Sequence, residues 1–86
     1  MFGIKLETPF IITLEMEGKV FVGEGATALE ALRAVKAPQK ITVKGVITVT
    51  HGDKKSRRLL TPIRLKRFFY PNAQRVLVKQ LVVGMK

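Results

Sequence analysis

Residues 8–22 read TPFIITLEMEGKVFV, and this stretch decides the fold. Every second residue from Phe10 to Met16 is apolar, and this period of two predicts a strand with one buried face. Residues 17–19, Glu-Gly-Lys, form a short glycine-containing turn signal, and the apolar run at 20–22 predicts a second strand. The segment is therefore predicted to be a β-hairpin.

A helix is predicted over residues 28–36. Thr27 and Glu30 match a capping box, in which the threonine hydroxyl and the glutamate carboxylate each accept a hydrogen bond from an otherwise unpaired backbone N–H. Pro38 ends the helix, because the residue before a proline avoids the α conformation. Since nine residues are too few for a stable isolated helix, we expect this one to pack on the sheet.

The second half of the chain is predicted to add a hairpin, a helix and a last strand. Residues 40–51 alternate apolar side chains with threonine and lysine, and residues 54–60 return as a charged edge strand. Residues 61–70 open with threonine and proline, which suit the N-cap and first position of a helix. The valine-rich segment 75–83 predicts the last strand.

These elements predict an α+β fold in which two short helices pack on one face of a small, mainly antiparallel sheet. The 86 residues are expected to form one compact domain, 1–86, since 47% apolar content is enough for a core. No apolar run approaches the roughly 18 residues of a membrane span. The N-terminal residues do not have the pattern of a secretory signal. The chain has no cysteine, which fits an intracellular, cytoplasmic protein.

The charge is divided between the two halves of the chain. Residues 1–38 carry four basic and five acidic side chains, a net charge of −1, whereas residues 39–86 carry twelve basic side chains and one acid, a net charge of +11. Such a field repels itself and attracts polyanions, of which RNA and DNA are the commonest. Binding to nucleic acid is therefore the first functional expectation.

The strongest functional feature is the segment 54–67, in which seven of fourteen residues are basic. Arg64 and Arg67, one helical turn apart, are predicted to bind phosphate with bidentate geometry. If strands 40–51 and 75–83 are neighbours, a second basic surface is expected on the polar face of the sheet, lined by Lys40, Lys44, Arg75 and Lys79. The candidate RNA-binding residues are Lys40, Lys44, Lys54, Lys55, Arg57, Arg58, Arg64, Lys66, Arg67, Tyr70, Arg75 and Lys79.

Aromatic side chains follow the arginines directly. Core packing is the favoured role for Phe68 and Phe69, whereas Tyr70, at the predicted helix end, is open between core packing and stacking on an unpaired base.

The sequence has few of the residue types that catalysis or metal binding requires. His51 is the only histidine and Ser56 the only serine, so neither a hydrolase triad nor a metal site is expected. The carboxylates of Glu15 and Glu17 are interpreted as part of a solvated face beside a turn. Residues 23–25 lack a phosphate-loop pattern. We expect no enzyme, no cofactor and no small-molecule substrate.

The chain resembles small ribosomal proteins of archaeal type in size, high pI, absence of cysteine, compact α+β pattern and a basic loop followed by a helix. The resemblance covers the whole chain and rests on composition rather than on a motif. It implies an rRNA-binding structural protein of the ribosome, with structured RNA as partner and neighbouring ribosomal proteins beside it. Two alternatives remain open: a DNA-binding chromatin or regulatory protein, and a basic module that binds an acidic protein or a membrane surface.

Overall fold

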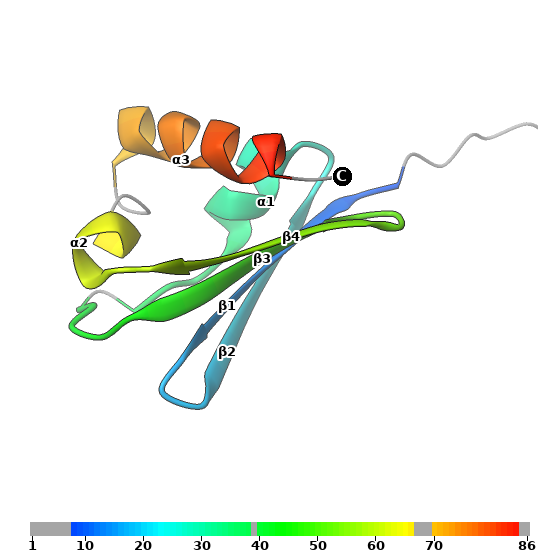
Figure 1. Ribbon diagram of the computed structural model, residues 1–86. Helices are drawn as coiled ribbons and strands as arrows, with labels where there is room; N and C mark the ends of the chain where they lie inside the picture. Colours follow the sequence, from blue (N-terminus) through cyan, green and yellow to red (C-terminus); the bar gives the residue numbers. More distant parts are fainter. Residues whose placement is uncertain (1–7, 39, 67–69, 85–86) are drawn as a thin grey trace, which may run out of the picture.

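The computed structural model describes residues 8–38, 40–66 and 70–84. In chain order its elements are β1 (Phe10–Met16), β2 (Lys19–Gly25), α1 (Ala28–Ala34), β3 (Gly45–His51), β4 (Lys54–Leu60), α2 (Pro62–Leu65) and α3 (Pro71–Val83). The strands form one antiparallel sheet in the order β2-β1-β3-β4, and α1 and α3 lie on one side of it (Figure 1). The predicted α+β fold, with a mainly antiparallel sheet and helices on one face, is confirmed.

The predicted hairpin is formed by β1 and β2, which pair along all seven residues of each strand. The two turn residues, Glu17 and Gly18, have φ values of 48° and 75°. Positive φ at both positions is what a two-residue turn needs in order to match the twist of the flanking strands. Gly18 adopts this conformation without steric cost because it has no Cβ.

The helix α1 begins with the predicted capping box. Thr27 Oγ1 accepts a hydrogen bond from the Glu30 backbone N–H at 3.1 Å, and a Glu30 carboxylate oxygen accepts one from the Ala26 N–H at 3.0 Å. The helix ends at Ala34, two residues earlier than predicted, because Val35 is already extended with φ −70° and ψ 119°.

The strand β3 begins at Gly45, so the prediction of a strand from residue 40 was wrong over its first five residues. The reason lies in the neighbouring strand: β1 pairs with β3 only as far as Glu15, opposite Val46, and then enters the hairpin turn. Residues 40–44 lie beyond that end and form a loop, which the buried side chain of Ile41 holds against the core. The strand β4 is at the sheet edge, as predicted.

The last element is the helix α3, so the prediction of a strand at 75–83 was wrong. Pro71 occupies its first turn, where a missing N–H removes no hydrogen bond. Leu77 and Leu81, four residues apart on one helix face, are both 1% exposed. Their burial on one face accounts for the helix.

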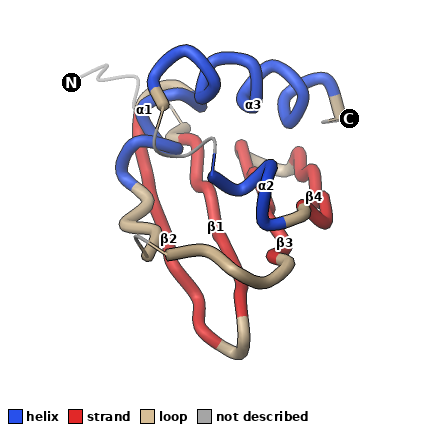
Figure 2. Tube along the Cα trace, turned by 90° about the vertical axis from the view of Figure 1, so that its left-hand side faces the viewer, coloured by secondary structure: helices blue, strands red, loops and turns tan. Residues whose placement is uncertain are grey.

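The helix α3 packs on α1 and contacts β4 (Figure 2). A side-chain hydrogen bond joins the two helices, since Arg33 Nε of α1 donates to Gln74 Oε1 of α3 at 3.3 Å. The helices thus form one layer, and the sheet forms the other.

The core lies between the helices and the covered face of the sheet. Leu65 of the short helix α2 closes one end of it. The buried core cluster comprises Ile12, Leu14, Met16, Ala31, Leu32, Val35, Ile41, Ile47, Val49, Leu60, Leu65, Leu77 and Leu81.

Candidate nucleic-acid interface

The strand order turns the charge division of the sequence into a division across the sheet. The strands β2 and β4 lie at opposite edges. Of the carboxylates among the described residues, Glu15, Glu17, Glu24 and Glu30 belong to the β1–β2 hairpin and α1, and Asp53 lies in the turn before β4. The strand β4 itself carries four lysines and arginines and no acid.

Each residue of β4 lies opposite a neutral residue of β3. Arg57 pairs in register with Thr48, and Arg58 with Ile47. Successive side chains of a strand point to opposite faces, so Lys55 and Arg57 lie on the face away from the helices, and Lys54 and Arg58 lie on the side of the helices. All four are exposed. Basic side chains on an edge strand also discourage pairing with another sheet.

The short helix α2 continues this charged surface. Thr61 is its N-cap and accepts a hydrogen bond from the Arg64 backbone N–H at 3.4 Å, as the sequence predicted. Leu65 is fully buried, whereas Arg64 and Lys66 are exposed. We call the exposed cations of β4 and α2 the basic band; its members are Lys54, Lys55, Arg57, Arg58, Arg64 and Lys66.

The end of the predicted 61–70 helix differs from the expectation. The helix α2 ends at Leu65, so the prediction of a helix as far as Tyr70 was too long. Arg67, Phe68 and Phe69 lie outside the described residues. Tyr70 is the N-cap residue of α3 and is 63% exposed, so it is not part of the core.

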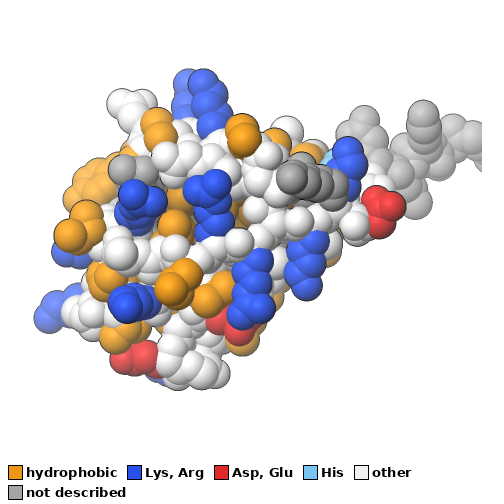
Figure 3. Space-filling view, in the orientation of Figure 1, with side chains coloured by type: hydrophobic (Ala, Val, Ile, Leu, Met, Phe, Trp, Pro, Cys, Tyr) orange, Lys and Arg blue, Asp and Glu red, His pale blue; other side chains and the backbone are white. Residues whose placement is uncertain are grey.

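The predicted second basic surface does not form on a sheet face, because residues 75–83 are helical. Arg75 and Lys79 are exposed on α3 at i and i+4, on one side of the helix, and Lys40 and Lys44 are exposed in the loop before β3. Figure 3 shows lysine and arginine side chains spread over α3, β4 and α2, with hydrophobic side chains between them and carboxylates in the lower part and at the right-hand end of the view.

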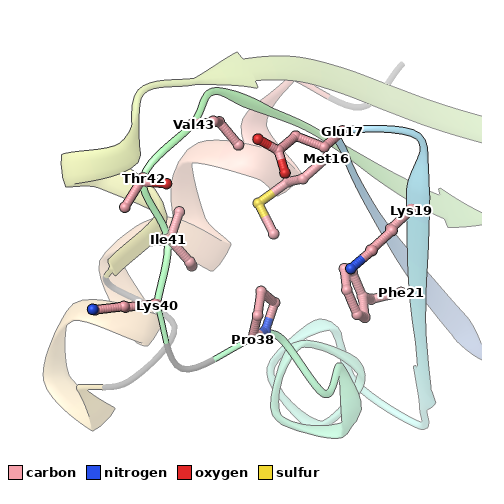
Figure 4. A pocket seen from close by; sticks show the side chains of 9 residues that line it. All are labelled: Met16, Glu17, Lys19, Phe21, Pro38, Lys40, Ile41, Thr42 and Val43. Carbon is pink, nitrogen blue, oxygen red and sulfur yellow. The ribbon is translucent and has the colours of Figure 1, made fainter.

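A pocket of about 150 Å³ lies between the β1–β2 turn and the loop before β3 (Figure 4). Its lining residues are Met16, Glu17, Lys19, Phe21, Pro38, Lys40, Ile41, Thr42 and Val43. The Met16 thioether points into it, whereas the Lys40 amine points away. This pocket could not be predicted from the sequence, because its walls come from separate segments that the fold brings together.

The histidine considered for catalytic or metal chemistry lies apart from the two glutamates considered with it. His51, the last residue of β3, stacks on Phe10 with ring centroids 3.9 Å apart and planes 1° apart. Glu15 is exposed on β1, and Glu17 belongs to the turn. Among residues 8–38, 40–66 and 70–84, no three histidine or carboxylate side chains are grouped for a metal ion, and no helix has the length and apolarity to cross a membrane.

No family model, curated protein or solved structure matches this chain.

Proposed function

We propose that the protein binds structured RNA through the basic band, as a structural component of a ribonucleoprotein particle. The observation that carries this proposal is the position of the band: six exposed cations follow one another along β4 and α2, at the sheet edge opposite β2 and its acidic neighbours. Phosphate groups of a nucleic acid are the commonest partners of such a surface.

The mechanism is neutralisation of phosphates by a rigid array. The strand β4 is held by its ladder to β3, and α2 is held by Leu65, so the side-chain stems start from fixed positions. Residues two apart on a strand are about 7 Å apart. Lys55 and Arg57 are two residues apart on one face of β4, and Lys54 and Arg58 are four apart on the other. The band therefore presents cations from fixed positions without ordering a flexible tail. Lys and Arg can reach phosphates by short adjustments of their side chains.

RNA is favoured over duplex DNA because α2 has only four residues, which is too short for a helix that reads the major groove. Structured RNA is recognised largely by shape and through its backbone, which a sheet edge with exposed cations suits. In this proposal the particle is the ribosome, with rRNA and neighbouring ribosomal proteins as partners, in the cytoplasm. The role is binding rather than catalysis, without cofactor or small-molecule substrate.

A salt titration of binding to structured RNA tests the proposal. With six phosphate contacts, a plot of log affinity against log salt has an expected slope of about −4 to −5. The double substitution Arg58→Glu and Arg64→Glu removes two contacts, so it should weaken binding strongly and reduce the slope by roughly 1.5–2. An affinity indifferent to salt contradicts the proposal.

The matched control is Lys19→Glu with Lys36→Glu. Both lysines are exposed and lie outside the band, and both double variants lower the net charge from +10 to +6, since each reversal removes two units. The control is expected to lose much less affinity. If both variants lose the same affinity, net charge rather than the band determines binding. Competition by duplex DNA at equal strength supports the DNA-binding alternative instead.

A further inference from the structure

The face of the sheet that points away from the helices has a regular composition. The helices cover the face of Ile12 and Leu14, and no helix among residues 8–38, 40–66 and 70–84 packs on the other face, which we call the open face. The alternate residues of each strand form it. By strand register, three rows cross it: Glu24, Ile11, Thr50 and Lys55; Val22, Thr13, Thr48 and Arg57; Val20, Glu15, Val46 and Leu59. In Figure 1, α1 and α3 both lie on the opposite side of the sheet.

This open face is more apolar than a solvated sheet face requires. Val20, Val22 and Leu59 are 58%, 57% and 65% exposed. When one face of an antiparallel sheet is exposed to water, its strands normally place polar side chains on that face. The two valines lie on the edge strand β2 and Leu59 on the edge strand β4, with threonines of β1 and β3 between the two edges. Aliphatic side chains left exposed at both edges are available for contact with a partner.

The charges on the open face are balanced and separated. Glu15 and Glu24 lie on β1 and β2, whereas Lys55 and Arg57 lie on β4. The face is therefore neutral, although the chain carries +10. If a second copy is rotated by 180° and placed against this face, the acidic half of each copy can face the basic half of the other.

We propose that the open faces of two copies of this chain pack together about a two-fold axis parallel to the strands. This rotation sets β2 of one copy over β4 of the other while each row faces the same row of its partner. Glu24 then faces Lys55 of the second copy, and Val20 faces Leu59 of the second copy. Sheets packed face to face lie about 10 Å apart, a separation that these side chains span from both sides.

The same register argues against a second way of packing the two open faces together. A two-fold axis in the plane of the face but perpendicular to the strands sets β4 over β4. The middle row then meets itself, and Arg57 lies opposite Arg57 of the second copy. Like charges facing each other oppose association. Of these two axes, only the one parallel to the strands sets opposite charges, Glu24 and Lys55, face to face.

The size of the face sets the strength of the association. Four strands about 4.8 Å apart and seven residues long give an area of roughly 19 by 23 Å, which is at the small end for protein interfaces. We therefore expect a reversible dimer that forms with rising concentration. Lys55 and Arg57 of the basic band lie on the open face, so the dimer and the proposed RNA binding would both use them, whereas Lys54, Arg58, Arg64 and Lys66 lie outside it. The inference goes beyond the proposed RNA binding and does not depend on it.

A charge-swap series measured by sedimentation equilibrium tests the dimer. The full chain is compared at low salt over a wide range of concentrations with Glu24→Lys, Lys55→Glu and the double variant that carries both changes. Each single substitution creates two like-charge contacts per dimer and should weaken association by about tenfold. The double variant restores opposite charges and should associate like the original chain.

Net charge provides an internal control, because the two single substitutions change it in opposite directions. The starting charge is +10; Glu24→Lys gives +12, Lys55→Glu gives +8, and the double variant returns to +10. If only overall repulsion mattered, Lys55→Glu would strengthen association, whereas specific pairing requires that it weaken it. A chain that stays monomeric throughout, or a double variant no better than the singles, overturns the proposal. Thermal unfolding confirms that each variant is folded.

Discussion

Gly23 of β2 lies directly against the backbone of Ala31 in α1. A Cβ built at Gly23 would collide with the Ala31 carbonyl oxygen and would lie 2.5 Å from the Val35 nitrogen. Both neighbours are backbone atoms, so no rotation of a side chain relieves the contact. The absence of a side chain at this position lets α1 rest on β2 at this short distance.

Gly23→Ala is therefore expected to destabilise the protein by about 1–3 kcal/mol, because the helix must move off the strand to make room. Denaturant unfolding measures this change. Gly84→Ala is the matched control: its φ is −76°, which alanine accepts, and the nearest obstacle is the Ser56 hydroxyl at 2.8 Å, which can rotate away. Equal destabilisation by the two substitutions contradicts the close contact of α1 with β2.

The elements with strong local signals were predicted correctly from the sequence. The β1–β2 hairpin has a period of two before its glycine turn and an apolar run after it, and α1 has a capping box. Both elements formed. The prediction of a strand at residues 40–44 was wrong because strand pairing ends where the partner strand β1 turns. The sequence of residues 40–44 alone does not reveal where that turn lies.

The helix α3 was missed because its valines favour a strand, whereas its packing favours a helix. β propensity is a weak, context-dependent preference that tertiary burial overrides. The available signal was Pro71, because proline suits the first turn of a helix, where it lies in α3. Leu77 and Leu81 then bury one face.

Two substitutions in α3 discriminate between the two interpretations of this segment. Leu81→Ala should cost about 2–5 kcal/mol, since the side chain is 1% exposed. Val83→Ala should change the free energy of unfolding by less than about 0.5 kcal/mol, since Val83 is 80% exposed. In a strand, Leu81 and Val83 would share a face and both would matter. Unfolding of the two variants under the same conditions measures the contrast.

The capping box gives a third prediction. Thr27→Ala removes the hydroxyl that accepts from the Glu30 N–H, so it should destabilise the protein by about 1 kcal/mol. Thr27→Ser keeps the acceptor and should retain most of the stability. The comparison by denaturant unfolding separates the hydrogen bond from other effects of the site. A serine variant as unstable as the alanine variant would show that the cap contributes little.

The candidate site was predictable only in part. The excess of cations in residues 54–67 is visible in the sequence, and so is the edge strand that carries much of it. Which cations share a surface depends on strand order and on α3, and neither can be derived from one sequence. Lys40 and Lys44 were therefore assigned to the polar face of the sheet, whereas they lie in the loop before β3.

Tyr70 provides the last prediction, which rests on the proposed RNA binding. Its side chain is 63% exposed at the start of α3, and Pro71 follows it in the first turn, so the ring extends from a fixed helix end. An exposed aromatic ring beside a cationic surface can stack on an unpaired base, an interaction of about 1–3 kcal/mol. Tyr70→Ala should therefore weaken binding to RNA with single-stranded loops by roughly 5- to 150-fold, whereas Tyr70→Phe should retain it. Binding to a continuous RNA duplex, which offers no unpaired base, should be equal for all three proteins.

Thermal unfolding of the Tyr70 variants should not change, because the ring is outside the core. If Tyr70→Ala weakens binding to the duplex as much as to the loops, the ring does not act by stacking.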